Sequence, residues 1–193
     1  MTLKNRLGKF IVISGPSGVG KGTICNILLS KKENNLSYSI SMTTRKKRIY
    51  EKNGVDYYFT SRDNFKKRIL NNEFLEYNLY NKEYYGTLKT EVLDKINKGI
   101  NVISELDVNG AKKIKNNFKD CILIYITAPN IEELRRRLIK RGTENKEEIE
   151  QRLKIAIYEE KEKINYDYVI MNDNLEIAIG KIQIIIKNFL IDK

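Results

Sequence analysis

Short apolar runs alternate along this chain with segments whose apolar residues recur at helical spacing. The first run, Phe10 to Ile13, contains no polar residue, which is typical of a strand buried on both faces. The segment after it predicts a helix at about 21–30, with Ile24, Ile27 and Leu28 as apolar positions. The same patterns predict strands at about 38–41, 101–105, 122–127 and 168–171, and helices at 108–116, 131–141 and 175–190. Such alternation predicts a parallel sheet with helices on both faces.

The stretch from about 45 to 87 has a different pattern. Short aromatic runs at 57–60, 74–77 and 83–85 predict strands, and Asn53-Gly54 and Asn81-Lys82 predict turns between them. A chain of 193 residues is long enough for one domain with small inserted lobes. We therefore expect an α/β core that carries a small mixed β lobe.

A glycine-rich segment joins the first strand to the first helix. Its residues fit the spacing G-x-x-x-x-G-K, in which glycines let successive N–H groups point at one anion. The helix adds the positive end of its dipole, and Lys21 adds a mobile charge for the outer phosphates. Gly22 stands where Ser or Thr usually holds the metal, and Thr23 lies one residue later, so the hydroxyl that contacts Mg²⁺ stays open. The candidate nucleotide-binding residues are Gly15, Pro16, Ser17, Gly18, Val19, Gly20, Lys21, Gly22 and Thr23. The sequence thus predicts a P-loop NTPase-type parallel sheet.

The charged residues add to this picture. A formal net charge of +11 suits either nucleic acid or small polyanionic substrates as partners. The chain has no histidine, which excludes Ser-His-Asp and Cys-His catalysis and any His-ligated metal. Chemistry must then rest on positive charge, a bound metal ion and positioning.

Composition also bears on the compartment. Cys25 and Cys121 both lie in apolar surroundings and are expected to be reduced core residues, which favours a cytoplasmic protein. No apolar run approaches the ~20 residues that span a bilayer, so no membrane partner is expected. The first nine residues lack the apolar core of a signal peptide.

The segment 41–48 is dense in hydroxyl groups and basic side chains. Arg45 and Arg48 are three residues apart, so both can reach one phosphate from a loop or turn. A solvated basic turn is the alternative that this segment alone leaves open.

Seven segments, in the same order along nearly the whole chain, resemble guanylate kinase. They are GPSGVGKGT at 15–23, SMTTRKKR at 41–48 with GVDYYF at 54–59, FLEYNLYNKEYYGT at 74–87, ELDVNGAKK at 105–113, RRRLIKRGTE at 135–144, QRLKIA at 151–156 and YDYVIMND at 166–173. The resemblance implies transfer of a phosphoryl group from ATP to GMP, with Mg²⁺ as the metal. It also implies three parts: a P-loop core (1–40, 88–129 and 160–193), a GMP-binding lobe (41–87) and a helical lid (130–159).

The resemblance also assigns the acceptor site. It implies that Arg45, Arg48, Tyr57 and Tyr85 bind the GMP phosphate, that Ser41, Glu76 and Asp107 read guanine, and that Thr87 lies near the base. The chemistry agrees, because a carboxylate can accept from N1–H and the exocyclic amine of guanine but would face an acceptor at N1 of adenine. Tyr84 is expected to pack within the lobe.

The remaining candidates concern the donor and the transfer itself. The resemblance makes Arg137, Arg141 and Arg152 lid arginines that act with Lys21 and Arg45 in catalysis, whereas Arg135 and Arg136 are expected to form surface ion pairs. It places Asn172 beside adenine. Glu105 and Thr23 are the candidates for Mg²⁺, in the case of Glu105 through water.

One departure from the family pattern concerns the phosphate loop. The family usually has Pro before the second arginine, whereas this chain has Lys47 before Arg48, which favours a more mobile loop. Three other functions stay open: a non-catalytic interaction module of the same fold, a nucleic-acid binder, and a kinase that acts on AMP. The intact P-loop argues against the first, the lack of a reader motif against the second, and the set Ser41, Glu76 and Asp107 against the third. Oligomeric state is left undetermined.

Overall fold

Five parallel strands form the main sheet of the computed structural model, which describes residues 6–80 and 82–191. In spatial order they are β2 (Leu36–Tyr38), β7 (Asn101–Glu105), β1 (Phe10–Ser14), β8 (Cys121–Thr127) and β9 (Tyr168–Met171). β1 pairs with both β7 and β8. The chain adds β2 and β7 on one side of β1 before it adds β8 and β9 on the other. The connections therefore diverge at the carboxyl end of β1, where sheets of this kind bind ligands. The predicted parallel sheet is confirmed.

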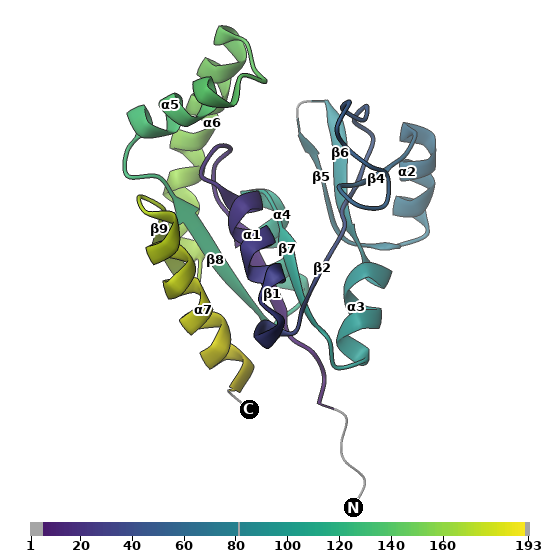
Figure 1. Cartoon of the computed structure of the whole chain (residues 1–193). Helices are drawn as coiled ribbons and strands as arrows, with labels where there is room; N and C mark the ends of the chain where they lie inside the picture. Colours follow the sequence, from purple (N-terminus) through teal and green to yellow (C-terminus); the bar gives the residue numbers. More distant parts are fainter. Residues whose placement is uncertain (1–5, 81, 192–193) are drawn as a thin grey trace, which may run out of the picture.

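The side chains of β1 alternate between two buried faces, which explains its unbroken apolar run. Ile11 and Ile13 belong to the hydrophobic core on one face, and Phe10 and Val12 to the core on the other. Helices cover both faces, as predicted (Figure 1). They are α1 (Lys21–Ser30) and α7 (Leu175–Ile191) on the first face, and α3 (Lys89–Asn97) and α4 (Val108–Asn117) on the second.

A second, smaller sheet forms the inserted lobe, which stands to one side of the main sheet (Figure 1). Its strands, in spatial order, are β4 (Tyr58–Phe59), β3 (Met42–Thr43), β6 (Glu83–Leu88) and β5 (Phe74–Tyr80), and the lobe also contains α2 (Arg62–Leu70). Phe65 of α2 stacks on Phe74 with ring centroids 4.4 Å apart, and on Tyr84, which therefore packs in the lobe as expected. The sequence did not predict α2, because Phe65 is the one buried side chain in that helix.

Two further helices project beyond the carboxyl ends of the main strands, on the side away from the lobe (Figure 1). They are α5 (Ile131–Arg141) and α6 (Lys146–Lys161). Gly142, with φ of 67°, ends α5, and the capping box of Asn145 and Glu148 begins α6. Leu134 and Leu138 of α5 lie so close to Gly18 that a Cβ there would meet Leu138 at 3.0 Å, so α5 packs directly on the glycine-rich loop.

The boundaries differ from the sequence expectation mainly around the lobe. The strand expected at 38–41 ends at Tyr38, because Ser39 makes the last backbone hydrogen bond to β7 before the chain leaves the main sheet. β5 and β6 are longer than the aromatic runs that predicted them. Of the expected turn at 81–82, Asn81 lies outside the described residues, and Lys82 has a φ of 66°. The short helices η1 (Lys32–Asn34) and η2 (Glu162–Asn165) complete the connections.

Two other sequence expectations concern composition. Cys25 and Cys121 are buried free thiols, as expected. Among the helices of residues 6–80 and 82–191, none has the length and apolar character needed to cross a membrane.

Candidate functional site

The glycine-rich loop runs from the end of β1 to the start of α1. Gly15 has a φ of +134°, and a Cβ there would lie 2.1 Å from the carbonyl oxygen of Ile126, so no other residue fits between β1 and β8. Gly20, with a φ of 97°, precedes the first residue of α1. The first turn of α1 carries no acidic side chain, so nothing there neutralises the positive end of the helix dipole. The loop therefore offers backbone N–H groups to an anion.

Lys21 is folded back over this loop. Its Nζ donates hydrogen bonds to the carbonyl oxygens of Gly15 at 2.6 Å and Pro16 at 3.0 Å. Arg152 of α6 reaches the same loop, where its Nη1 donates to the Ser17 hydroxyl at 2.8 Å. Two cations thus stand at the loop, one from the core and one from the projecting helices.

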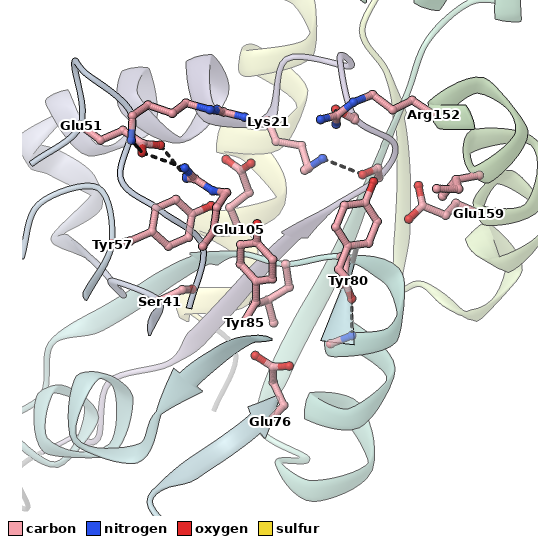
Figure 2. A pocket seen from close by; sticks show the side chains of 18 of the residues that line it. Lys21, Ser41, Glu51, Tyr57, Glu76, Tyr80, Tyr85, Glu105, Arg152 and Glu159 are labelled. Atoms are coloured by element: carbon pink, nitrogen blue, oxygen red, sulfur yellow. Dashed lines mark hydrogen bonds and ion pairs between the residues drawn. The ribbon is translucent and has the colours of Figure 1, made fainter. Parts of the chain in front are cut away.

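A cavity of about 250 Å³ opens beside this loop and extends toward the lobe (Figure 2). The predicted site residues that line it are Gly15, Ser17, Lys21, Ser41, Arg45, Arg48, Tyr57, Glu76, Tyr85, Glu105, Asp107, Arg141 and Arg152. Core, lobe and projecting helices all contribute, so the fold brings together residues that are far apart in the sequence.

Two carboxylates define the end of the cavity nearest the lobe. Glu76 of β5 is buried, and its Oε1 accepts from the Thr87 hydroxyl at 2.7 Å. Asp107 begins α4, where its Oδ1 accepts from the Gly110 N–H at 2.7 Å and its Oδ2 from the Asn78 amide at 3.0 Å. A Cβ at Gly110 would lie 3.0 Å from Glu76 Oε2 and 3.4 Å from Asp107 Oδ1, so this glycine keeps room for both acids.

The environment of Glu76 alters its protonation. Burial raises its pKa to about 7, the Thr87 hydrogen bond and Lys113 oppose this, and Asp107 reinforces it. Near neutral pH the Glu76 side chain is therefore a mixture of carboxylate and carboxylic acid.

Aromatic hydroxyls and a paired arginine define the middle of the cavity. The Tyr57 and Tyr85 rings meet edge to face with centroids 6.0 Å apart, and the Arg45 guanidinium lies 5.4 Å from the Tyr57 ring. Burial raises the pKa of Tyr57 to about 12, so its hydroxyl stays protonated and can donate. Arg45 is not free, because Glu51 binds both of its terminal nitrogens, at 3.0 and 2.7 Å.

The arginines of the projecting helices share one carboxylate. Arg152 Nη2 lies 3.2 Å from Glu144 Oε1, and Arg141 Nη2 binds the same oxygen. Burial disfavours the charge of Glu144, but hydrogen bonds from Thr143 and Arg141 outweigh this and lower its pKa. These two arginines therefore already bind an anionic oxygen, here one of the protein's own.

Several predicted site residues lie outside the cavity lining. Arg137 points elsewhere, with its Nε 2.7 Å from Glu133 Oε1 and its Nη2 2.8 Å from the carbonyl oxygen of Asn172. The Asn172 amide is buried and donates to the carbonyl oxygen of Val19 at 2.8 Å, so it ties the end of β9 to the glycine-rich loop. Thr87 is fully buried behind Glu76, and Thr23 is exposed on α1.

The other predicted loop residues lie beside the cavity but do not line it. Pro16, Gly18, Val19, Gly20 and Gly22 complete the turn around Lys21 without lining the cavity. The expected surface pairs form on the projecting helices, where Arg135 binds Glu150 and Arg136 binds Glu133.

Glu105 is the carboxylate that fits a metal ion. It ends β7 and lines the cavity, and a Cβ at Gly22 would lie 3.4 Å from its Oε2. No cluster of three or more acidic or cysteine side chains suited to a metal occurs within residues 6–80 and 82–191. One carboxylate beside a phosphate loop suits Mg²⁺, which usually takes its other ligands from water and substrate phosphates.

The sequence analysis missed four residues with polar or charged side chains in or beside the cavity: Glu51, Tyr80, Glu144 and Glu159. Glu159 had a usable signal, because Arg152, Ile155 and Glu159 repeat at helical spacing and all line the cavity. Burial raises the pKa of Glu159 to about 7, with Lys21 opposing the shift. Glu51 and Glu144 lie between elements, where no periodicity marks them.

The fold and the loop define a class of protein before any comparison is made. A parallel sheet whose central strand leads through a glycine-rich turn into a helix, with a lysine and an arginine over that turn, is a P-loop protein that binds phosphorylated ligands. The carboxylates 76 and 107 at the far end of the cavity add a polar site suited to a nucleobase.

Comparisons with known proteins define the family. The family model described as guanylate kinase matches residues 7–189. The guanylate kinase of Clostridium tetani is 46% identical over 179 residues, which make up 93% of this chain and 85% of that protein. That of Enterococcus faecalis is 44% identical over 188 residues, or 96% of this chain and 92% of that protein. A crystal structure of guanylate kinase from Anaplasma phagocytophilum aligns with a TM-score of 0.80 at 32% identity, covering 97% of this chain and 89% of that one. The chain therefore belongs to the guanylate kinase family, whose enzymes phosphorylate GMP with ATP.

Proposed function

We propose that ATP and GMP occupy opposite ends of the cavity, with ATP on the glycine-rich loop and GMP on the lobe. The reaction is that of the family, in which ATP and GMP give ADP and GDP. One observation supports the division most directly: a single cavity has cations over a phosphate loop at one end and two carboxylates at the other. The two substrates' phosphates would then meet between Lys21 and Arg45.

At the lobe end, the proposal assigns guanine to Glu76, Asp107 and Ser41. An ionised Glu76 can accept from both N1–H and the exocyclic amine, and its bond from Thr87 fixes its orientation. We assign the GMP phosphate to Arg45, Arg48, Tyr57 and Tyr85, which supply guanidinium and phenol donors.

The transfer step needs little proton chemistry. An oxygen of the GMP phosphate attacks the γ-phosphorus of ATP in line, the bond from that phosphorus to the β,γ-bridging oxygen breaks, and ADP leaves with the electron pair. The attacking oxygen is already anionic, so we expect no general base and no covalent enzyme intermediate. Lys21, the loop amides, Arg141 and Arg152 would stabilise the charge on the moving group, and positioning supplies the rest.

Mg²⁺ completes the proposed donor site. It would supply positive charge between the outer phosphates of ATP. Glu105 is the residue we assign to it, through water, because its carboxylate makes no hydrogen bond or ion pair within residues 6–80 and 82–191 and lies at the mouth of the loop. The exposed hydroxyl of Thr23 lies on the same helix as Gly22, and we retain it as the second candidate.

We further propose that the segment 130–159 acts as a lid over the core, and that 41–87 forms the GMP lobe. The contacts of Arg141 and Arg152 with Glu144 are made within the lid, so a phosphate can replace this carboxylate without unfolding any helix. Arg137 and Asn172 hold the lid and the loop together, and Arg137 would reach the phosphates only after the lid moves. Closure would exclude water and so limit ATP hydrolysis.

The substrates proposed here are small molecules, and we propose no nucleic acid partner and a cytoplasmic location. The basic surface alone would also suit nucleic acid. A gel shift that persists in Lys21→Ala, while kinase activity is lost, would support nucleic-acid binding instead.

The assignment is tested by measuring ADP release from ATP with GMP, AMP, UMP or dTMP, with and without Mg²⁺. We expect activity with GMP and Mg²⁺, and a kcat/KM for AMP lower by roughly 10³-fold or more, because adenine would leave buried carboxylates unpaired. Equal rates with AMP and GMP would refute the assignment of the base site. An inactive protein that still binds GMP would indicate an interaction module.

The raised pKa of Glu76 predicts a pH dependence. The ionised carboxylate is the form that accepts from guanine, so we expect KM for GMP to rise as pH falls below about 7, the pKa of this group. Glu76→Gln should raise KM for GMP at every pH and abolish this dependence. Initial rates from pH 5.5 to 8.5, with GMP and then ATP varied, separate this effect from Glu159, which faces Lys21 and should act on ATP.

The same shift has a consequence for stability. The folded pKa of Glu76 lies above the unfolded value of 4.5, so its contribution is most favourable below pH 4.5 and is lost as pH rises toward 7. Glu76→Gln should therefore be at least as stable as the wild type above pH 7 in thermal unfolding. A variant that is less stable at pH 8 and retains the KM profile would contradict both expectations.

A further inference from the structure

One carboxylate organises the loop that carries both phosphate-binding arginines of the lobe. Glu51 Oε1 accepts from Arg45 Nη2 at 2.7 Å, and its Oε2 accepts from Arg45 Nη1 at 3.0 Å. Both side chains are mostly buried, with 19% of Arg45 and 14% of Glu51 exposed, and both line the cavity. The pair is bidentate and shielded from solvent, unlike the exposed pairs on the lid.

Glu51 also closes the loop through the backbone. Its Oε2 accepts from the Arg48 N–H at 2.7 Å, and its own N–H donates to the Arg48 carbonyl oxygen at 3.2 Å. The segment 44–52 has no helix or strand of its own, and residue 47 is Lys rather than the proline usual in this family. These contacts supply the restraint that a proline would otherwise provide.

The geometry of the pair leaves part of Arg45 available. A guanidinium has five N–H donors in a fixed plane, so one that binds a carboxylate through both Nη atoms keeps the edge formed by Nε and one Nη. The carbonyl oxygen of Lys46 accepts a further hydrogen bond from Arg45 Nη1, at 2.8 Å. The Nε edge is then the one that can bind a phosphate through two parallel hydrogen bonds. Besides Glu51, Tyr85 also interacts with Arg45 and helps to raise its pKa.

We propose that Glu51 is a positioning residue for the acceptor: it orients Arg45 and fixes the turn at Arg48 so that both can bind the phosphate of GMP. This inference rests on the proposed placement of that phosphate on Arg45. The same contacts have an alternative interpretation, in which Glu51 occupies the phosphate position only until GMP displaces it. The two interpretations predict changes of opposite sign, because loss of a competing anion would tighten GMP binding.

Glu51→Gln tests the inference, because it keeps the size of the side chain and removes its charge. We expect kcat/KM for GMP to fall by roughly 10- to 100-fold, mostly through KM, with KM for ATP unchanged. Glu73→Gln is the matched control: it removes the other carboxylate that pairs with an arginine of the lobe, Arg68 at 2.6 Å, away from the cavity. Its KM for GMP should remain that of the wild type.

Two more variants extend the test, and the first of them keeps it decisive if Glu51→Gln folds poorly. Glu51→Asp keeps the charge but is too short to reach both Arg45 and the Arg48 N–H, and it should raise KM for GMP in the same direction. Lys47→Pro in the Glu51→Gln background should restore part of the loss by stiffening the turn. An unchanged or lower KM for GMP in Glu51→Gln and Glu51→Asp, or an equal rise in KM for ATP, would overturn the inference. If the wild type itself did not phosphorylate GMP, the proposed function would fail instead.

Discussion

Arg152→Ala should slow phosphoryl transfer by roughly 3–5 kcal/mol in activation free energy, which is about 10²- to 10⁴-fold in kcat. Arg152 contacts the loop hydroxyl of Ser17 and lines the cavity between the two proposed nucleotide sites. A guanidinium there can stabilise the charge that develops on the transferred group, and alanine offers no donor at this position. The effect should fall on kcat, because it arises mainly in the transition state.

ADP release at saturating ATP and GMP measures this expectation. Arg135→Ala is the control, since Arg135 lies on α5, which packs against the helix of Arg152, and its pair with Glu150 is exposed on the surface. That variant should retain nearly wild-type turnover. Arg152→Ala with unaltered kcat would remove Arg152 from the transfer step.

The core of the fold could be predicted because its signals are local. Strands buried on both faces leave unbroken apolar runs, and Phe10 to Ile13 is one of them. The loop that follows needs glycine for steric reasons, as the close approach of Gly15 to Ile126 shows. Sequence spacing and three-dimensional constraint therefore agree at the centre of the site. The helix α2 gave no such signal, because most of its side chains face solvent.

The arginines of α5 show where local patterns stop being sufficient. Residues 137 and 141 are four apart on α5, and helical spacing places them on one face. The structure nonetheless separates their partners, since Arg137 binds Glu133 and Asn172 while Arg141 turns to Glu144 and the cavity. Long side chains such as these can bind residues outside their own helix, and the spacing of residues along the helix does not specify which ones.

The carboxylates that bind Arg45, Arg141 and Arg152 could not be predicted for a related reason. Glu51 and Glu144 lie in connecting segments, and each is defined by what it binds rather than by a repeat. Asn172 illustrates the converse case, because the family resemblance implies a place beside adenine, and the structure adds that its buried amide donates to the carbonyl oxygen of Val19. Contact with adenine stays a prediction that a nucleotide complex would test.

Lys21→Ala should have the largest effect on the use of ATP, with a loss of at least about 10³-fold in kcat/KM for ATP. Its ammonium group donates to the carbonyl oxygens of Gly15 and Pro16, so the protein itself holds it at the loop. When phosphates bind, we expect it to exchange these carbonyl oxygens for the charged oxygens of ATP, a stronger interaction. Alanine offers no charge in either state.

The variant also tests the division of the cavity. Because Lys21 lies at the loop end, GMP binding measured by calorimetry should stay within about twofold of the wild type while ATP binding weakens. Lys31→Ala is the control: Lys31 follows the same helix and binds Gln183 at 2.8 Å, outside the cavity. If Lys21→Ala weakened GMP and ATP binding equally, the two nucleotides could not occupy separate ends of the cavity, because a cation at one end would then act on both.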